Sequence, residues 1–138
     1  MLLTEIDHIA IAVRDLNAAV AFYEQAFGAK VAHRELVKSD GVEEVLLRVA
    51  ESYVQLLMPV SDESPVAKAI ARRGEGLHHV GYRVANCANA LRALIAAGAI
   101  PIDNEPRPGS RGTIVAFVHP KSTFGTLIEL VQEQTGQG

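Results

Sequence analysis

Two histidines occupy the same position in two similar stretches of this chain. The stretch Asp-His-Ile-Ala-Ile-Ala-Val at residues 7–13 returns as His-His-Val-Gly-Tyr-Arg-Val at residues 78–84, so His8 and His79 are equivalent. A neutral imidazole is a common metal ligand, although a single histidine in a strand is more often structural. The matched placement favours a shared metal site, and His33, which has no matched partner, is not expected to belong to it.

A second pair of matched stretches supplies oxygen donors. Residues 54–57 and 128–131 align with Gln55 and Glu129 in register. An ionised carboxylate among aliphatic neighbours, as Glu129 is, is costly to bury without a partner. Two imidazoles, one carboxylate and one amide oxygen suit a divalent first-row metal better than a thiolate zinc site or an all-oxygen calcium site. The predicted metal ligands are His8, Gln55, His79 and Glu129.

Glu44 is the candidate general base. In the alternating stretch 42–49, Glu43 shares a face with three aliphatic residues, whereas Glu44 shares the other face with Leu46 and Arg48. The more apolar face should pack under a helix. Glu44 would then lie on the opposite face of the sheet, in the cleft where the metal ligands are also expected. There it could abstract a proton from a metal-bound substrate. The alternative is that Glu44 is solvated or only pairs with Arg48.

Basic and hydroxyl side chains gather in two loops of the second half, at residues 105–112 and 119–125. Residues of these types are common in ordinary turns. Placed at the rim of a cleft, they would instead bind a phosphate-rich or carboxylate ligand. The candidate substrate-binding residues are Arg107, Arg111, Lys121, Ser122 and Thr123.

The elements that must position these side chains follow the same order twice, β-α-β-β-β. Strands are expected at residues 6–13, 30–37, 42–49, 53–58, 77–84, 99–103, 113–118 and 126–132, and helices at 16–27, 65–73 and 88–97. The sequence therefore predicts the α+β class, with two paired βαβββ modules that form a curved mixed sheet around a metal-binding cleft. We expect one domain over residues 1–138, with modules at about 5–73 and 74–132.

Composition narrows the possible partners and location. The net charge of −3 gives no electrostatic reason to expect nucleic acid or an anionic membrane. No stretch approaches the ~18 uninterrupted apolar residues of a spanning helix, and the first residues lack a signal-type core. Cys87 is the only cysteine and cannot form an internal disulfide. We expect a cytoplasmic protein with no nucleic-acid or membrane partner.

In these residues and in its repeated strand order, the chain resembles the vicinal oxygen chelate superfamily, also called the glyoxalase and bleomycin resistance superfamily. Within it, several stretches resemble the methylmalonyl-CoA epimerases. They lie at residues 7–13, 41–44, 55–59, 74–80 and 119–130. The most specific is the last, in which His-Pro-Lys-Ser-Thr runs into Leu-Ile-Glu-Leu. The resemblance covers about residues 6–132, and the Pro- and Ser-containing loop at 107–112 departs from the expected glycine- and lysine-rich version.

The resemblance implies an isomerase that interconverts (R)- and (S)-methylmalonyl-CoA through an enolate. It implies a divalent metal, with Co²⁺ first and Mn²⁺, Ni²⁺, Zn²⁺ or Mg²⁺ as alternatives. It also implies an acyl-CoA substrate and a homodimer. The family's ligands carry over onto the four residues named above, and its acid/base glutamates onto Glu44 and Glu129. We expect Glu129 to act first as a ligand and Glu44 to be the principal base.

Two other functions remain open at this point. A glyoxalase-type lyase acting on a thiol adduct would share the fold and most of the metal set, but would normally carry a carboxylate in place of Gln55. A metal-free binding protein of the same fold would usually lack the ligand residues. An extradiol dioxygenase fits less well, because only 5% of the residues are aromatic.

Overall fold

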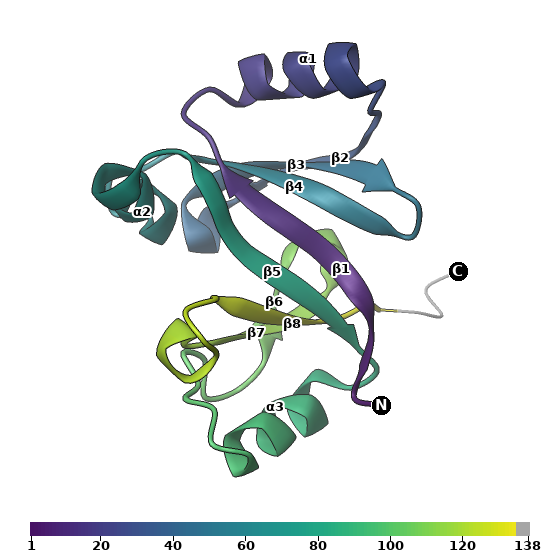
Figure 1. The fold of residues 1–138 in the computed structure, drawn as a ribbon, viewed down its shortest axis with the longest axis vertical. Coiled ribbons are helices and arrows are strands. Elements are labelled where there is room, and N and C mark those ends of the chain that lie inside the picture. Colours follow the sequence, from purple (N-terminus) through teal and green to yellow (C-terminus); the bar gives the residue numbers. More distant parts are fainter. Residues whose placement is uncertain (135–138) are drawn as a thin grey trace. The chain divides into compact units, whose positions relative to one another are not determined.

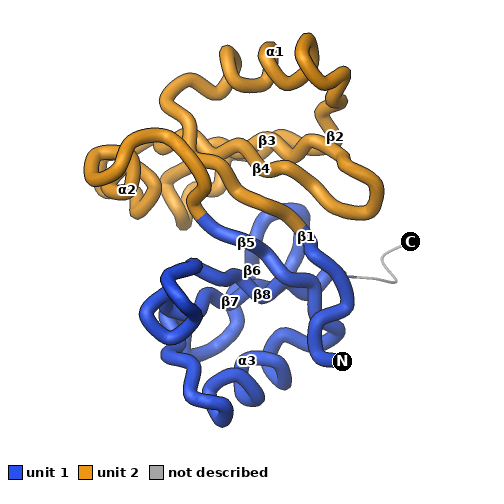
Figure 2. The backbone as a smooth tube through the Cα atoms, viewed as in Figure 1, with its two compact units in different colours: residues 1–7, 79–138 blue, residues 8–78 orange. Residues whose placement is uncertain are grey.

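The computed structural model describes residues 1–134, which divide into two compact units. One unit is formed by residues 8–78, and the other by residues 1–7 together with the chain from His79 onward (Figure 2). We call them the first-half unit and the second-half unit. Both borders fall within strands, between Asp7 and His8 and between His78 and His79. The expectation of one domain over residues 1–138 reaches beyond the described residues and stays a prediction.

The first half of the chain contains four strands and two helices (Figure 1). They are β1 (Leu3–Ala12), α1 (Leu16–Phe27), β2 (Val31–Val37), β3 (Val42–Val49), β4 (Ser52–Pro59) and α2 (Pro65–Arg73). The strand order is β2-β3-β4-β1. The first three strands are antiparallel, and β1 runs parallel to β4. A short 3-10 turn, η1 (Lys38–Asp40), joins β2 to β3.

The second half repeats this plan. It contains β5 (Gly76–Val84), α3 (Cys87–Ala96), β6 (Arg107–Pro108), β7 (Ile114–Val118) and β8 (Ile128–Gln132), with 3-10 turns η2 (Ser110–Gly112) and η3 (Pro120–Ser122). The strand order is β6-β7-β8-β5, with β5 parallel to β8 and the other pairs antiparallel. The predicted α+β class and the duplicated β-α-β-β-β order are confirmed.

Helix α1 covers one face of the first-half sheet (Figure 1). Asp15 caps it by accepting a hydrogen bond from the amide of Ala18, and Gly28 ends it in the left-handed conformation, at φ 65°. A buried cluster joins the helix to the sheet. Its members are Val13, Leu16, Val20, Val45, Leu47 and Leu56. This packing decides orientation, because alternate residues of β3 and β4 must then lie on the opposite face.

Helix α3 plays the same part in the second half. Asn86 caps it by accepting a hydrogen bond from the amide of Asn89. Its buried residues pack on the sheet in one cluster, which contains Val84, Cys87, Ala90, Leu91, Ala116 and Leu130. Helix α2 differs, because Val66 and Ile70 pack with Ala10, Ala12 and Leu57 on the face that α1 leaves open. Helix α2 therefore covers one end of that face.

The strand predicted at residues 99–103 was wrong. Only one isolated bridge, Pro101 with Val118, forms there, and the strand that pairs with β7 is β6, inside the predicted loop. Pro101 has no backbone N–H to donate to a ladder. The carboxylate of Asp103 accepts the hydrogen bond from the amide of Phe117 at 2.8 Å. A side chain thus replaces part of the ladder that a regular strand would have formed.

Among residues 1–134, no helix combines the length and the apolar character needed to cross a membrane.

Candidate active site

Strand register places the four predicted ligand positions in the same way in both halves. In the first half, Gln55 on β4 lies beside Ala10 on β1, two residues after His8. In the second half, Glu129 on β8 lies beside Gly81 on β5, two residues after His79. The equivalence read from the sequence is therefore an equivalence in the hydrogen-bonded ladders of each half.

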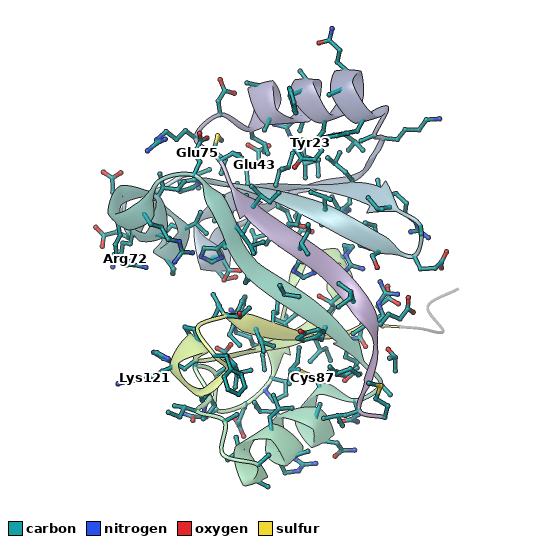
Figure 3. The ribbon with its side chains drawn as sticks, in the orientation of Figure 1. Tyr23, Glu43, Arg72, Glu75, Cys87 and Lys121 are labelled. Carbon is teal, nitrogen blue, oxygen red and sulfur yellow. The ribbon has the colours of Figure 1, made fainter. Side chains whose placement is uncertain are left out.

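Glu44 and Gln55 meet on the face of the first-half sheet that points away from α1. Glu44 is 2% exposed and Gln55 is 7% exposed. The amide Nε2 of Gln55 donates a hydrogen bond to Oε1 of Glu44 at 2.7 Å. The neighbouring Glu43 lies on the α1 side (Figure 3), where its carboxylate accepts a hydrogen bond from Arg34 at 2.8 Å. Alternation along β3 thus separates two adjacent glutamates into different environments, as expected from the sequence.

The hydrogen bond to Glu44 fixes which end of the Gln55 amide is available. Because Nε2 is used as a donor, the carbonyl oxygen Oε1 is the end left for another partner. Oε1 is buried and receives no hydrogen bond from the residues that the structure describes. A buried acceptor without a donor is costly, so a ligand that binds this oxygen would relieve a real penalty.

His8 is buried and shares the open face of the first-half unit with Gln55. It lies opposite Tyr53, two residues before Gln55, in the β1–β4 ladder. Side chains two residues apart on a strand point to the same side of the sheet. The first-half unit therefore presents one imidazole and one amide oxygen on a single face.

His79 and Glu129 form the corresponding pair in the second-half unit. His79 Nε2 lies 3.0 Å from Glu129 Oε1, and both residues are buried on the face opposite α3. The ring of Phe117 packs edge-on against His79, with centroids 5.1 Å apart. This contact restricts the imidazole while leaving Nε2 directed at the carboxylate.

These donors fit a divalent metal ion. Two ligands bonded at ~2.1 Å with a right angle at the metal would lie about 3 Å apart, which is the separation of the His79 and Glu129 atoms. Imidazole nitrogen, carboxylate oxygen and an amide oxygen with no donor are all suitable ligand atoms. His8 and Gln55 belong to one unit and His79 and Glu129 to the other, so each pair is complete within its own unit.

Glu44 breaks the symmetry of the repeat. It lies opposite Leu57, two residues after Gln55, in the β3–β4 ladder. The equivalent position in the second half is Val115, which lies opposite Val131, two residues after Glu129. One half therefore carries a buried carboxylate where the other carries an aliphatic side chain. A buried carboxylate beyond the matched ligand set, present in one half only, is a candidate for acid–base chemistry.

Arg111 is held in an ion-pair network. Its guanidinium donates to Oδ2 of Asp7 at 2.9 Å and to Glu133 at 3.3 Å, and Arg83 donates to Oδ1 of Asp7 at 2.9 Å. Burial alone would lower the pKa of Arg83. The hydrogen bond to Asp7 and the charges of Asp7, Glu133 and Glu5 outweigh it, and the pKa of Arg83 is raised above its ordinary value. Arg111 therefore anchors the loop that carries it, and its contact with substrate stays a prediction.

The other predicted substrate-binding residues divide into two groups. Arg107 stacks over the ring of Phe117 at 5.6 Å and pairs with Asp103, which places a cation next to the ring that packs on His79. Lys121 extends outward from the η3 turn (Figure 3). Ser122 and Thr123 use their hydroxyl groups inside that turn, with Ser122 donating to the carbonyl of His119 and Thr123 to that of Thr126.

Two further polar residues lie near Glu44: Glu35, which the sequence analysis missed, and His33, which it set aside as a metal ligand. Glu35 on β2 lies directly opposite Glu44, and His33 Nε2 lies 2.8 Å from Oε1 of Glu35. Ligand atoms of the three residues lie within 4.8 Å of one another. The pairing of Glu35 with Glu44 could have been predicted from the sequence, because it follows from a hairpin in which Val37 faces Val42.

The chain is similar to known proteins over most of its length. A family model described as the Glyoxalase/Bleomycin resistance protein/Dioxygenase superfamily matches residues 7–117. The chain is 36% identical over 129 residues to an ethylmalonyl-CoA/methylmalonyl-CoA epimerase from Cereibacter sphaeroides, covering 92% of this chain and 96% of that protein.

Two solved structures are also similar over nearly the whole chain. A methylmalonyl-CoA epimerase in complex with methylmalonyl-CoA and NH4+ is 39% identical, with a TM-score of 0.93 and 96% of each chain covered. A glutamate-to-glutamine variant of the Streptomyces coelicolor methylmalonyl-CoA epimerase, in complex with 2-nitronate-propionyl-CoA, is 38% identical, with a TM-score of 0.93. That match covers 96% of this chain and 99% of the other.

Proposed function

Since the chain belongs to the Glyoxalase/Bleomycin resistance protein/Dioxygenase superfamily, we propose that it is an isomerase that interconverts (R)- and (S)-methylmalonyl-CoA. The observation that carries this proposal is the hydrogen bond between Gln55 and Glu44. It joins a metal-ligand position to a buried carboxylate that is positioned to act as a base. The similarity to epimerases over nearly the whole chain supplies the substrate class.

The substrate suits a carboxylate base. Its α-proton lies between a thioester carbonyl and a carboxylate, and its removal leaves an enolate whose charge spreads onto oxygen. Inversion requires that the proton leaves one face of the α-carbon and that a proton returns on the other. We assign the first transfer to Glu44, which is buried and held by Gln55. General acid–base catalysis of this kind typically contributes 10²–10⁴-fold to the rate.

The metal would be held by His8, Gln55, His79 and Glu129. When bound, such an ion supplies Lewis acidity toward oxygen atoms of the substrate. The buried acceptor Oε1 of Gln55 and the close pair of His79 and Glu129 support this assignment. We propose Co²⁺ first, with Mn²⁺, Ni²⁺, Zn²⁺ and Mg²⁺ as alternatives. Glu129 serves as a ligand first, so the second proton transfer falls to its other oxygen or to another group.

Gln55 separates this function from that of a glyoxalase-type lyase. A carboxylate at this position would face Glu44 across 2.7 Å, and two like charges at that distance repel strongly in a buried site. The amide instead donates to Glu44 and offers an oxygen with no negative charge to a metal. Glutamine can therefore donate a hydrogen bond to Glu44 and bind a metal at the same time, which a glutamate could not do while Glu44 is ionised.

Arg107 and Lys121 are the best-placed candidates for binding the CoA part of the substrate. Both are cations of the second-half unit, and neither is buried. Arg111 is a weaker candidate for binding CoA, because its guanidinium already donates hydrogen bonds to Asp7 and Glu133. The homodimer, the cytoplasmic location, and substrate contacts by Ser122 and Thr123 stay predictions from the sequence.

The test is a direct assay of stereochemical inversion. Purified protein, stripped of metal and then reloaded with Co²⁺, should convert (S)-methylmalonyl-CoA to the (R) form, which methylmalonyl-CoA mutase consumes. Parallel samples receive the hemithioacetal of methylglyoxal and glutathione. Turnover of the hemithioacetal alone would reassign the protein as a glyoxalase-type lyase. Protein purified without chelator that contains no metal, and that after Co²⁺ addition has no activity on either substrate, would favour a metal-free binding protein.

A further inference from the structure

Glu44 has almost no contact with solvent in the described residues. It is 2% exposed, Gln55 occupies one carboxylate oxygen, and its ladder partner on β4 is the aliphatic Leu57. A base that removes a proton from one face of the substrate ends the reaction protonated. It must lose that proton before it can act again in the same direction. An amide such as that of Gln55 can hold a hydrogen bond, but it does not carry a proton onward at neutral pH.

The group that can carry the proton stands on the opposite side of Glu44. Glu35 of β2 is its direct partner in the β2–β3 ladder, and His33 Nε2 lies 2.8 Å from Oε1 of Glu35. Ligand atoms of His33, Glu35 and Glu44 lie within 4.8 Å of one another, a span that one carboxylate rotation or one bridging water covers. The side chains of His33 and Glu35 are 33% and 35% exposed.

These observations place two acid–base groups between a buried carboxylate and the partly exposed side of β2. Arg34, which lies between His33 and Glu35 in the sequence, points to the other face and donates to Glu43 and Asn17. The two groups are therefore the residues that alternation places on the side of Glu44.

We infer that His33 and Glu35 form a proton relay that connects Glu44 to solvent. This inference rests on the proposed function. The proton taken from the α-carbon resides on Glu44, passes to the carboxylate of Glu35, and then passes to Nε2 of His33 to form an imidazolium. A water molecule or buffer base accepts it, which returns all three residues to their starting state. The reverse sequence loads a proton onto Glu44 for the opposite direction of inversion.

The experiment compares two relay variants, His33→Gln and Glu35→Gln, with the control Arg34→Gln, which removes the charge between them on the opposite face. Each Co²⁺-loaded protein is assayed with methylmalonyl-CoA at low buffer concentration and then with increasing imidazole. Loss of the relay should lower kcat roughly 10-fold or more, which is less than the ~10²–10⁴-fold contributed by an acid or base that acts on the substrate directly, with little change in KM. Imidazole should restore the rate of His33→Gln, and the control should keep the wild-type rate.

Metal content and far-ultraviolet circular dichroism of each variant separate this role from others. Unchanged kcat in both relay variants would overturn the relay, as would a loss in His33→Gln that imidazole does not restore. Loss of one metal equivalent from His33→Gln would overturn it in favour of a second metal site at His33, Glu35 and Glu44. If the wild type does not turn over methylmalonyl-CoA, the proposed function fails and the relay falls with it. If the wild type is active, failure of the variants to respond rejects the relay alone.

Discussion

At the scale of single residues, the chemistry depends on how two neighbouring glutamates differ. Glu43 is tied to Arg34 on the helix-covered face, and Glu44 is buried beside Gln55 on the other. The alternation of β3 was sufficient to predict this division from the sequence. The contact between Glu44 and Gln55 could not be predicted in the same way, because it depends on the register between β3 and β4 and on which end of the amide turns toward the carboxylate.

Substitution of these two glutamates should have very different effects. Glu44→Gln keeps the shape of the side chain but removes the base, so kcat should fall by about 10²–10⁴-fold. Metal content should remain that of the wild type, because Glu44 is not one of the ligands. Glu43→Gln, the matched control, should retain most activity. Steady-state epimerisation rates and metal analysis check both variants, and near-normal turnover by Glu44→Gln would remove Glu44 from the mechanism.

Cys87 provides a prediction about pH. Burial, together with the charges of Glu129 and Asp103, raises the pKa of its thiol to about 11. The folded protein therefore keeps the thiol neutral at a pH where the unfolded chain, with a thiol pKa near 9.0, has lost the proton. Stability is unaffected below pH 9 and should fall as the pH rises from 9 toward 11.

Two measurements examine that expectation for Cys87. Urea unfolding at pH 8 and at pH 10 should show a larger loss of stability in the wild type than in Cys87→Ala. Iodoacetamide at pH 8 should label the unfolded chain and leave the folded protein almost unlabelled. Rapid labelling of the folded protein would show that the thiol is accessible, contrary to its complete burial.

At the scale of elements, the sequence predicted the helices and long strands well, because local signals determine them. Asp15 and Gly28 mark the ends of α1, and Ser64 and Pro65 mark the start of α2. The strand at residues 99–103 failed for the opposite reason. Its apolar residues suggested a ladder, but Pro101 and the side chain of Asp103 prevent a regular one. The short β6 has only two residues, and no periodicity can be read from so short a segment.

The network around Asp7 connects the loop that contains η2 to the middle of β1. Asp7 is completely buried and accepts hydrogen bonds from both Arg83 and Arg111. Asp7→Ala leaves two guanidinium groups without this partner, which typically costs 3–5 kcal/mol in a buried pair. Glu5→Ala, which removes a half-exposed partner of Arg83, should cost no more than ~1 kcal/mol. Chemical denaturation of the metal-free proteins measures both, and equal losses would contradict this account of the network.

At the scale of the whole molecule, the repeat explains why the chain carries two similar halves that are not identical. Each half builds the same four-strand ladder and places one imidazole and one oxygen donor at equivalent positions. The halves differ at two equivalent positions that the proposed chemistry uses: the first half has Gln55 where the second has Glu129, and Glu44 where the second has Val115. The sequence revealed the first difference directly. The second became visible only with the strand register, because Glu44 has no recognisable sequence counterpart.

The central claim is that this protein removes and returns the α-proton of methylmalonyl-CoA and that Glu44 is the base. The most direct test follows incorporation of deuterium from D₂O into the α-carbon by mass spectrometry or NMR. The Co²⁺-loaded wild type should incorporate deuterium while it inverts the stereocentre, and Glu44→Gln should slow incorporation by at least ~10²-fold. No incorporation by the metal-loaded wild type, above the rate of substrate alone, would contradict the account.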